Sequence, residues 1–169
     1  MEIRRYTKKD FIALSALWTR PEVWKGLVDD YTADADAKVV ILGYLRNPTV
    51  YLVGKDPEKD CFVFVPFGGM GMAEVHTVFA REARHKVQTA RDAVGWLFEN
   101  TQYRAVSTFV QIDKKERHSL GSFFASACGM NKVGVLPKSF KRDGVFLDQV
   151  LYQATLEDYQ EMRRKLCRQ

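Results

Sequence analysis

The chain has 169 residues, of which 46% are hydrophobic and 28% charged, and its formal net charge is +5. This composition predicts a globular domain and excludes a disordered chain. No stretch approaches the roughly 18 consecutive apolar residues that a membrane-spanning helix needs, so no membrane partner is expected. The positive charge favours an anionic partner, either a nucleic acid or a phosphorylated cofactor.

The three cysteines, Cys61, Cys128 and Cys167, are far apart in the sequence. An odd number of widely spaced cysteines without a Cys-x-x-Cys or Cys/His cluster supports neither a disulfide framework nor a zinc site. The first residues alternate like a strand and lack the apolar region of a signal peptide. We therefore expect reduced thiols, no bound metal and a cytoplasmic location.

The N-terminal part predicts one short strand followed by helices. Thr7 and Asp10 give the Ser/Thr-x-x-acid pattern that starts a helix, and Pro21 stands at an early position of a second helix. Asn47-Pro48 ends a third helical stretch, because the residue before a proline disfavours helical geometry. The predicted elements are a strand at 3–6 and helices at 11–18, 21–29 and 35–45.

From residue 49 onward, β-branched and aromatic residues predict a meander of three strands, with Gly68-Gly69 between the second and the third. Helices and strands then alternate, and Thr155 and Asp158 repeat the pattern of a helix start. The predicted strands are 49–53, 61–67, 71–79, 105–112, 131–136 and 145–154, and the predicted helices are 87–98, 120–128 and one that begins at Thr155. A turn is expected at 141–144. The order predicts one mixed-sheet α/β domain.

Four short motifs follow one another near the C-terminus: Gly-Met at 129–130, Val-Gly-Val-Leu-Pro at 133–137, Arg-Asp-Gly-Val at 142–145 and Asp-Gln-Val-Leu-Tyr at 148–152. In this order and spacing the chain resembles the GNAT superfamily of acyl-CoA-dependent acyltransferases. The pattern is similar to that of members that acetylate the N-termini of ribosomal proteins, and of divergent members found in bacteriophages.

The resemblance implies a fold and a cofactor. The fold is a single α/β domain over residues 1–169, with a mixed, mostly antiparallel sheet and helices on both faces. The fourth and fifth strands, 71–79 and 105–112, would splay apart and leave main-chain groups for the pantetheine arm of acetyl-CoA to satisfy. The pyrophosphate would lie on the N-terminus of the next helix. The residues implied in cofactor binding are Thr77, Val78, Phe79, Arg84, His85, Lys86 and Val87.

Glu74 and His76 are the candidate catalytic residues. They are two residues apart on a predicted strand, so their side chains fall on the same face of the sheet. A carboxylate and an imidazole placed together can remove a proton from an amine, directly or through water. A glutamate on this strand often serves as the base in the family, which makes Glu74 the first choice and His76 the second.

Two features depart from the family pattern. The two glycine positions of the phosphate-binding loop hold His85 and Val87, whose side chains would crowd a diphosphate. The tyrosine that protonates the leaving thiolate in many relatives is replaced by Ala125. A thiol with a pKa near 8.5 is a fair leaving group, so loss of a dedicated acid would slow the reaction without excluding it.

Trp24 and Tyr152 are the candidate acceptor-binding residues. The helix that carries Trp24 forms one wall of the acceptor cleft in the family, whereas Tyr152, on the last strand, either faces the acceptor or belongs to the core.

Two functions stay open. One is an N-acyltransferase that moves an acetyl group from acetyl-CoA to a primary amine on a small molecule or a protein N-terminus. The alternative is a non-catalytic GNAT-fold protein that binds a virion or host protein during phage assembly. Its location would then be the host cytoplasm or the virion. A nucleic-acid partner is supported by charge alone, since no recognised binding motif accompanies it.

Overall fold

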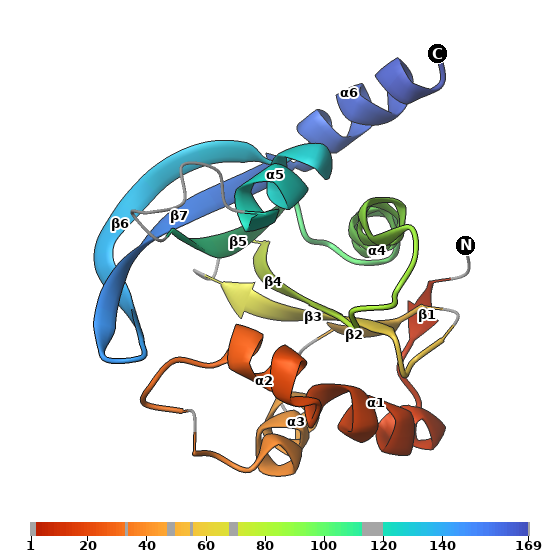
Figure 1. The fold of residues 1–169 in the computed structure, drawn as a ribbon. Helices are drawn as coiled ribbons and strands as arrows, with labels where there is room; N and C mark the ends of the chain where they lie inside the picture. The colour runs from red at the N-terminus through yellow and green to blue at the C-terminus, as the bar shows by residue number, and fades with distance from the viewer. Residues whose placement is uncertain are drawn as a thin grey trace.

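Figure 1 shows the computed structural model of the chain, in which residues 3–32, 34–46, 50–54, 56–67, 71–112 and 120–168 are described. Within these residues, seven strands form one sheet in the order β1-β2-β3-β4-β5-β7-β6. All neighbouring strands are antiparallel except β4 and β5, which are parallel. Helices α1, α2 and α3 cover one face of the sheet, and α4 and α5 cover the other (Figure 1). The predicted fold class is confirmed.

The strands are β1 (Arg4–Arg5), β2 (Val50–Val53), β3 (Asp60–Phe67), β4 (Met72–Phe79), β5 (Ala105–Ile112), β6 (Asn131–Arg142) and β7 (Val145–Thr155). The α-helices are α1 (Phe11–Trp18), α2 (Pro21–Leu27), α3 (Ala37–Arg46), α4 (Lys86–Asn100), α5 (Leu120–Ala127) and α6 (Leu156–Leu166), and a 3-10 turn, Lys8–Asp10, precedes α1. Apart from β6, the predicted bounds differ from these by at most two residues. The predicted breaks at Asn47-Pro48 and Gly68-Gly69 lie outside the described residues.

β6 is longer than the sequence predicts. The strand continues beyond residue 136 to Arg142, so that only Asp143 and Gly144 remain in the turn. The register with β7 shifts between Leu136 and Phe140, around Pro137, which has no N–H to donate to the ladder. The proline makes the local sequence look like the end of a strand, whereas pairing with β7 resumes beyond it.

The core has two parts, one on each face of the sheet. Side chains of β3 alternate between them: Phe62 and Phe64 join the part under α4 and α5, while Cys61 and Val63 join the part under α1 and α2. All four are fully buried. A strand buried on both faces needs an almost unbroken apolar run, which is what residues 61–67 provide.

Asp10 joins the first strand to the first helix. Its buried carboxylate accepts hydrogen bonds from the Arg4 guanidinium at 2.6 and 2.7 Å, and from the Thr7 backbone N–H at 2.7 Å. The Arg4 hydrogen bond is the main cause that holds the pKa of Asp10 well below its ordinary value, with the Thr7 donors adding to it and burial opposing it. The ionised carboxylate is therefore part of the folded structure.

Replacing Asp10 with Asn should lower the free energy of unfolding at pH 7 by about 2 kcal/mol, since a hydrogen bond to a charged group contributes roughly 1.5–3 kcal/mol. The folded-state pKa lies below the unfolded value of about 3.9, so this contribution is complete above that value and is lost as the pH falls toward the folded-state pKa. In urea titrations, wild type and D10N should therefore converge as the pH is lowered below 4.

The matched control is Asp158→Asn. Asp158 forms the same box with Thr155 at the start of α6, and among the described residues no arginine pairs with it. This variant should lose only about 1 kcal/mol, the value of a helix cap. Equal losses for D10N and D158N at every pH would contradict the role given to the Arg4–Asp10 pair.

Candidate cofactor and acceptor site

The strands β4 and β5 are joined only where they begin. Their paired residues are Met72 with Ala105, Ala73 with Val106, and Glu74 with Ser107. Beyond this point β4 stays paired with β3 as far as Phe79, and β5 stays paired with β7 as far as Ile112. Within the described residues, the facing edges of 75–79 and 108–112 therefore have no strand partner. The predicted splay is confirmed, and we call it the wedge.

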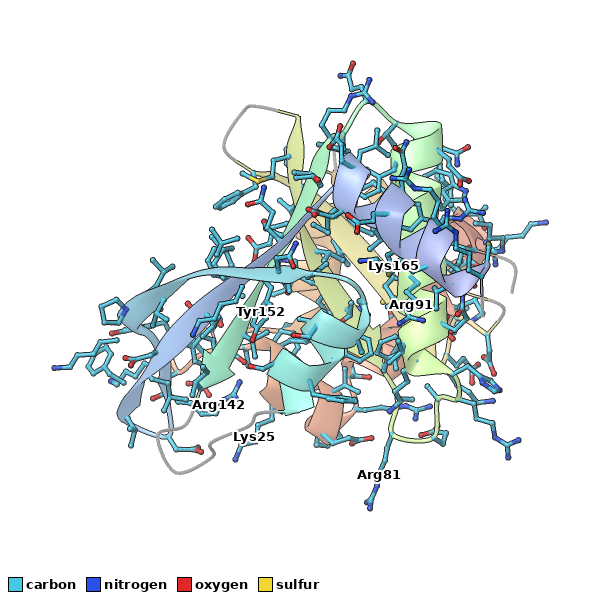
Figure 2. All side chains as sticks on the ribbon, turned by 90° about the horizontal axis from the view of Figure 1, so that it is seen from above. Lys25, Arg81, Arg91, Arg142, Tyr152 and Lys165 are labelled. Atoms are coloured by element: carbon cyan, nitrogen blue, oxygen red, sulfur yellow. The ribbon has the colours of Figure 1, made fainter. Side chains whose placement is uncertain are left out.

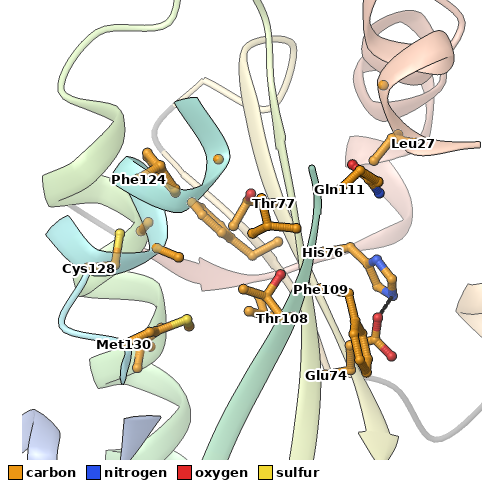
Figure 3. Close-up of a pocket in the computed structure, with 18 residues that line it drawn as sticks. Leu27, Glu74, His76, Thr77, Thr108, Phe109, Gln111, Phe124, Cys128 and Met130 are labelled. Carbon is orange, nitrogen blue, oxygen red and sulfur yellow. Dashed lines mark ion pairs between the residues drawn. The ribbon is translucent and has the colours of Figure 1, made fainter. Parts of the chain in front are cut away.

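A cavity of about 200 Å³ lies at the wedge. On one side it is lined by Leu27, Glu74, His76 and Gln111, and on the other by Phe124, Cys128 and Met130 (Figure 3). Because α2 and α5 cover opposite faces of the sheet, the cavity reaches from one face to the other through the gap between the two strands. We name the side with Leu27, Glu74, His76 and Gln111 the acceptor mouth, after the acceptor expected from the sequence, and the α5 side is mostly apolar.

Glu74 stands at the apex of the wedge, in the last residue pair that β4 makes with β5. Its Oε1 is 3.5 Å from His76 Nε2, and the two side chains are 22% and 33% exposed (Figure 3). Burial is the main cause that lowers the pKa of His76, and the charge of Glu74 opposes it. The imidazole is therefore neutral at neutral pH, and the prediction that the two side chains share a face is confirmed.

The loop before α4 takes a glycine-like backbone conformation without a glycine. His85 caps the helix with φ 54° and ψ 31°, in the left-handed region that side chains disfavour. The first backbone bond of the helix runs from the Thr89 N–H to the His85 carbonyl at 2.9 Å. The N–H groups of 84–88 donate no hydrogen bond to any described residue, so they remain available to an anion.

The side chains of this loop lie in different surroundings. Arg84 and His85 are exposed, and neither makes an ion pair with a described residue. Val87 packs against the core, away from the loop. The Lys86 ammonium donates to the Arg81 carbonyl at 3.1 Å and lies 5.9 Å from the centre of the Phe79 ring. The expected crowding by Val87 is therefore not present, because the side chain turns inward.

The three predicted cofactor-binding residues of β4 point to different places. Thr77 lines the cavity, whereas the Val78 side chain is buried under α1 and offers only its main chain. Phe79 packs edge-on against Phe62 and Phe124, with ring centres 5.5 and 5.7 Å apart. Ala125, where many relatives have a tyrosine, is buried in the cavity wall.

Neither Trp24 nor Tyr152 is among the residues that line the cavity. Trp24 packs against the core under α1 and α2, and Tyr152 is 7% exposed within the core under α4 and α5. Tyr152 shares the buried face of β7 with Val150 and Ala154, which lie two residues before and after it, so its side chain points into the core. For Tyr152 the core alternative therefore holds, and for Trp24 the expected contact with this cavity is not observed. From α2 the cavity is lined instead by Gly26 and Leu27, at the end of the helix.

Sequence reasoning missed several lining residues. Thr108 and Gln111 on β5 and Cys128 after α5 carry polar groups into the cavity, but none belongs to a motif. Burial raises the pKa of the Cys128 thiol to about 11, against the opposing charge of Arg91. The thiol is therefore protonated at neutral pH and is not a nucleophile.

Within the described part of the chain, no three His, Cys, Asp or Glu side chains are grouped closely enough to hold a metal ion. None of the helices there is long and apolar enough to cross a membrane.

Several solved structures share this fold. A GNAT-family acetyltransferase from Bacillus anthracis is 18% identical, with a TM-score of 0.67 over 92% of this chain and 94% of that one. A ribosomal-protein-alanine N-acetyltransferase from Brucella melitensis is 17% identical, with a TM-score of 0.66 over 92% and 100%. A spermidine N-acetyltransferase from Vibrio cholerae, in complex with CoA and spermine, is 13% identical, with a TM-score of 0.75 over 94% and 97%. The chain thus has the GNAT fold.

Residues 62–165 match the sequence profile of a family described as a protein of unknown function, DUF2824. The match covers more than half of the chain, and the chain belongs to this family. A search of curated proteins found no match.

The strained backbone at His85 gives a test of the loop. Because a left-handed residue with a side chain costs about 1 kcal/mol relative to glycine, His85→Gly should be more stable to thermal unfolding than His85→Ala by about that amount. At Gln88, inside the helix, the order should reverse, since glycine is about 1 kcal/mol worse than alanine there. H85A as stable as H85G would show that residue 85 is not left-handed.

Proposed function

We propose that the protein is an N-acyltransferase that transfers an acetyl group from acetyl-CoA to a primary amine. The wedge is the observation that carries this proposal. It combines two unpaired strand edges, a cavity that joins both faces of the sheet, and a carboxylate at the apex. The likeness to acetyltransferase structures supports it, one of them in complex with CoA and spermine.

The residues of this chain fit the cofactor. The main chain of Thr77, Val78 and Phe79 lies along the open edge of β4, where the pantetheine amides would complete the ladder like an added strand. The free N–H groups of 84–88 and the positive end of α4 would hold the pyrophosphate, with Arg84, His85 and Lys86 beside it and Val87 in the first turn. Acetyl-CoA supplies an activated thioester.

Glu74 is the base in this proposal, and His76 assists it. An amine with a pKa near 10 is mostly protonated at pH 7, so it must lose a proton before it can attack a carbonyl carbon. The Glu74 carboxylate faces the acceptor mouth and can take that proton directly or through water. The His76 imidazole beside it is neutral because of its burial, so one ring nitrogen carries no proton and can accept or relay one.

The acceptor mouth favours a cationic amine next to an apolar group. Of the residues that line it, Glu74 carries the negative charge, while Leu27 and Phe109 present apolar surface and Gln111 an amide. A carboxylate among neutral groups attracts an ammonium more strongly than it would in bulk water. This arrangement fits either a small amine or the N-terminus of a protein.

Glu74→Gln tests the assigned base. We expect kcat/KM to fall by about 10²–10⁴, the usual range for general base catalysis. The assay is release of free CoA from acetyl-CoA in the presence of n-butylamine, spermidine or a peptide with an N-terminal alanine. Stabilisation by acetyl-CoA should be the same in E74Q and in wild type, about 2.7 kcal/mol at 100 times the dissociation constant.

Glu99→Gln is the control, because Glu99 is a surface carboxylate on α4 that pairs with Arg163. It should keep full turnover. Full turnover in E74Q would remove Glu74 as the base and leave cofactor binding untouched. If millimolar acetyl-CoA fails to stabilise the wild-type protein, the acyltransferase proposal is wrong, and the non-catalytic interaction protein becomes the better explanation.

A further inference from the structure

Asp30, in the connection that follows α2, binds the tip of the β6–β7 hairpin. Its Oδ1 accepts the Asp143 N–H at 2.8 Å, and its Oδ2 accepts the Gly144 N–H at 2.7 Å. In the opposite direction, the Asp30 N–H donates to the Lys141 carbonyl at 3.0 Å. One aspartate therefore makes three hydrogen bonds to backbone that lies more than a hundred residues away in the sequence. We call this set of bonds the clamp.

The turn is shaped to receive a carboxylate. Asp143 and Gly144 both have positive φ, 50° and 77°, and together they join Arg142 to its strand partner Val145. Positive φ at both central residues is typical of a two-residue type I′ hairpin turn. The N–H groups of its two central residues are not used by the ladder, and successive N–H groups can bind an anion together. Asp30 supplies that anion from within the chain.

Side chains on both segments reinforce the clamp. Arg142 Nη2 donates to the Gly26 carbonyl at 3.4 Å, and Lys25 Nζ is 3.5 Å from Asp143 Oδ2. Figure 2 shows Lys25 and Arg142 near each other at this edge of the molecule. The Lys141 ammonium lies 5.5 Å from the centre of the Tyr31 ring. These contacts reach Gly26 itself, which lines the acceptor mouth.

The clamp connects the hairpin to the cavity through α2. This helix has seven residues, Pro21–Leu27, too few to be stable on their own. Gly26 and Leu27 are its last residues and form the wall of the acceptor mouth opposite Glu74. Asp30 comes three residues after Leu27. Because its carboxylate is held by the hairpin turn, the position of Gly26 and Leu27 is held as well.

We propose that Asp30 is a positioning residue, which sets the width of the acceptor mouth by holding the end of α2 on the β6–β7 hairpin. The inference rests on the proposed function in so far as the cavity receives an acceptor. It adds a determinant of acceptor size that touches neither substrate nor reacting atoms. A released clamp would let Gly26 and Leu27 move away from Glu74, so small amines would be held less well and bulky ones would enter more easily.

The test compares Asp30→Asn with Asp29→Asn. The asparagine has the same shape, but its amide NH2 replaces one carboxylate oxygen and would face a turn N–H donor, so the two-oxygen arrangement is lost. Asp29 is the matched control, because the hydrogen bonds that its carboxylate accepts from described residues all come from its own turn, from Tyr31 and Thr32. Hydrogen exchange of backbone amides is measured first, since it needs no substrate.

In D30N, amides in 24–28 and 142–146 should exchange about tenfold faster than in wild type, the effect of losing one charged hydrogen bond. Amides in β3 and α4 should be unchanged, and D29N should resemble wild type in all four regions. Wild-type exchange rates in 24–28 of D30N would overturn the inference, because the wall would then be held without the clamp.

The kinetic arm separates positioning from general stability. In D30N, KM for n-butylamine should rise about tenfold, while kcat and the affinity for acetyl-CoA stay at wild-type values. The ratio of kcat/KM for an alanine-N-terminal hexapeptide to that for n-butylamine should rise. An equal fall in kcat for both acceptors would overturn the positioning role. If wild type acylates neither acceptor while D30N exchanges faster, the proposed function has failed and the clamp stands.

Discussion

β4 and β5 share three residue pairs and then diverge. This divergence positions the groups proposed to act in the reaction, which are the Glu74 and His76 side chains and the open main chain of β4. Each strand has a full partner on its other edge, β3 for β4 and β7 for β5, so the sheet remains continuous although the two strands diverge. Main-chain groups left open along 75–79 and 108–112 must be satisfied by something else. The same divergence lets one cavity reach both faces of the sheet, with Glu74 at its apex.

Much of the fold could be predicted because its signals are local. Thr7 and Thr155 each start a helix with an aspartate three residues later, and both capping boxes form. The nearly continuous apolar run of β3 reports burial on both faces. Pro137 shows the limit of this reasoning: it interrupts the local pattern, and only pairing with the distant β7 shows that β6 continues.

The site could be predicted only in part. Alternation along β4 placed Glu74 and His76 together, since strand geometry has a fixed period. The same rule could not say which face of β7 packs under the helices. Tyr152 lies on that buried face and therefore belongs to the core. His85 was expected to crowd the loop; its backbone adopts the left-handed conformation that a glycine would supply there, which the residue type does not indicate. The Asp30 contact with the hairpin depends on tertiary structure, and no local pattern could reveal it.

The most direct measurement is hydrogen exchange of backbone amides with and without acetyl-CoA. If the cofactor adds itself to the open edge of β4, amides in 75–79 that face the wedge should exchange about tenfold more slowly or better when it binds. Amides in 72–74, already covered by β5, should not change. Slower exchange confined to the loop before α4, or no change anywhere, would contradict the role given to the wedge.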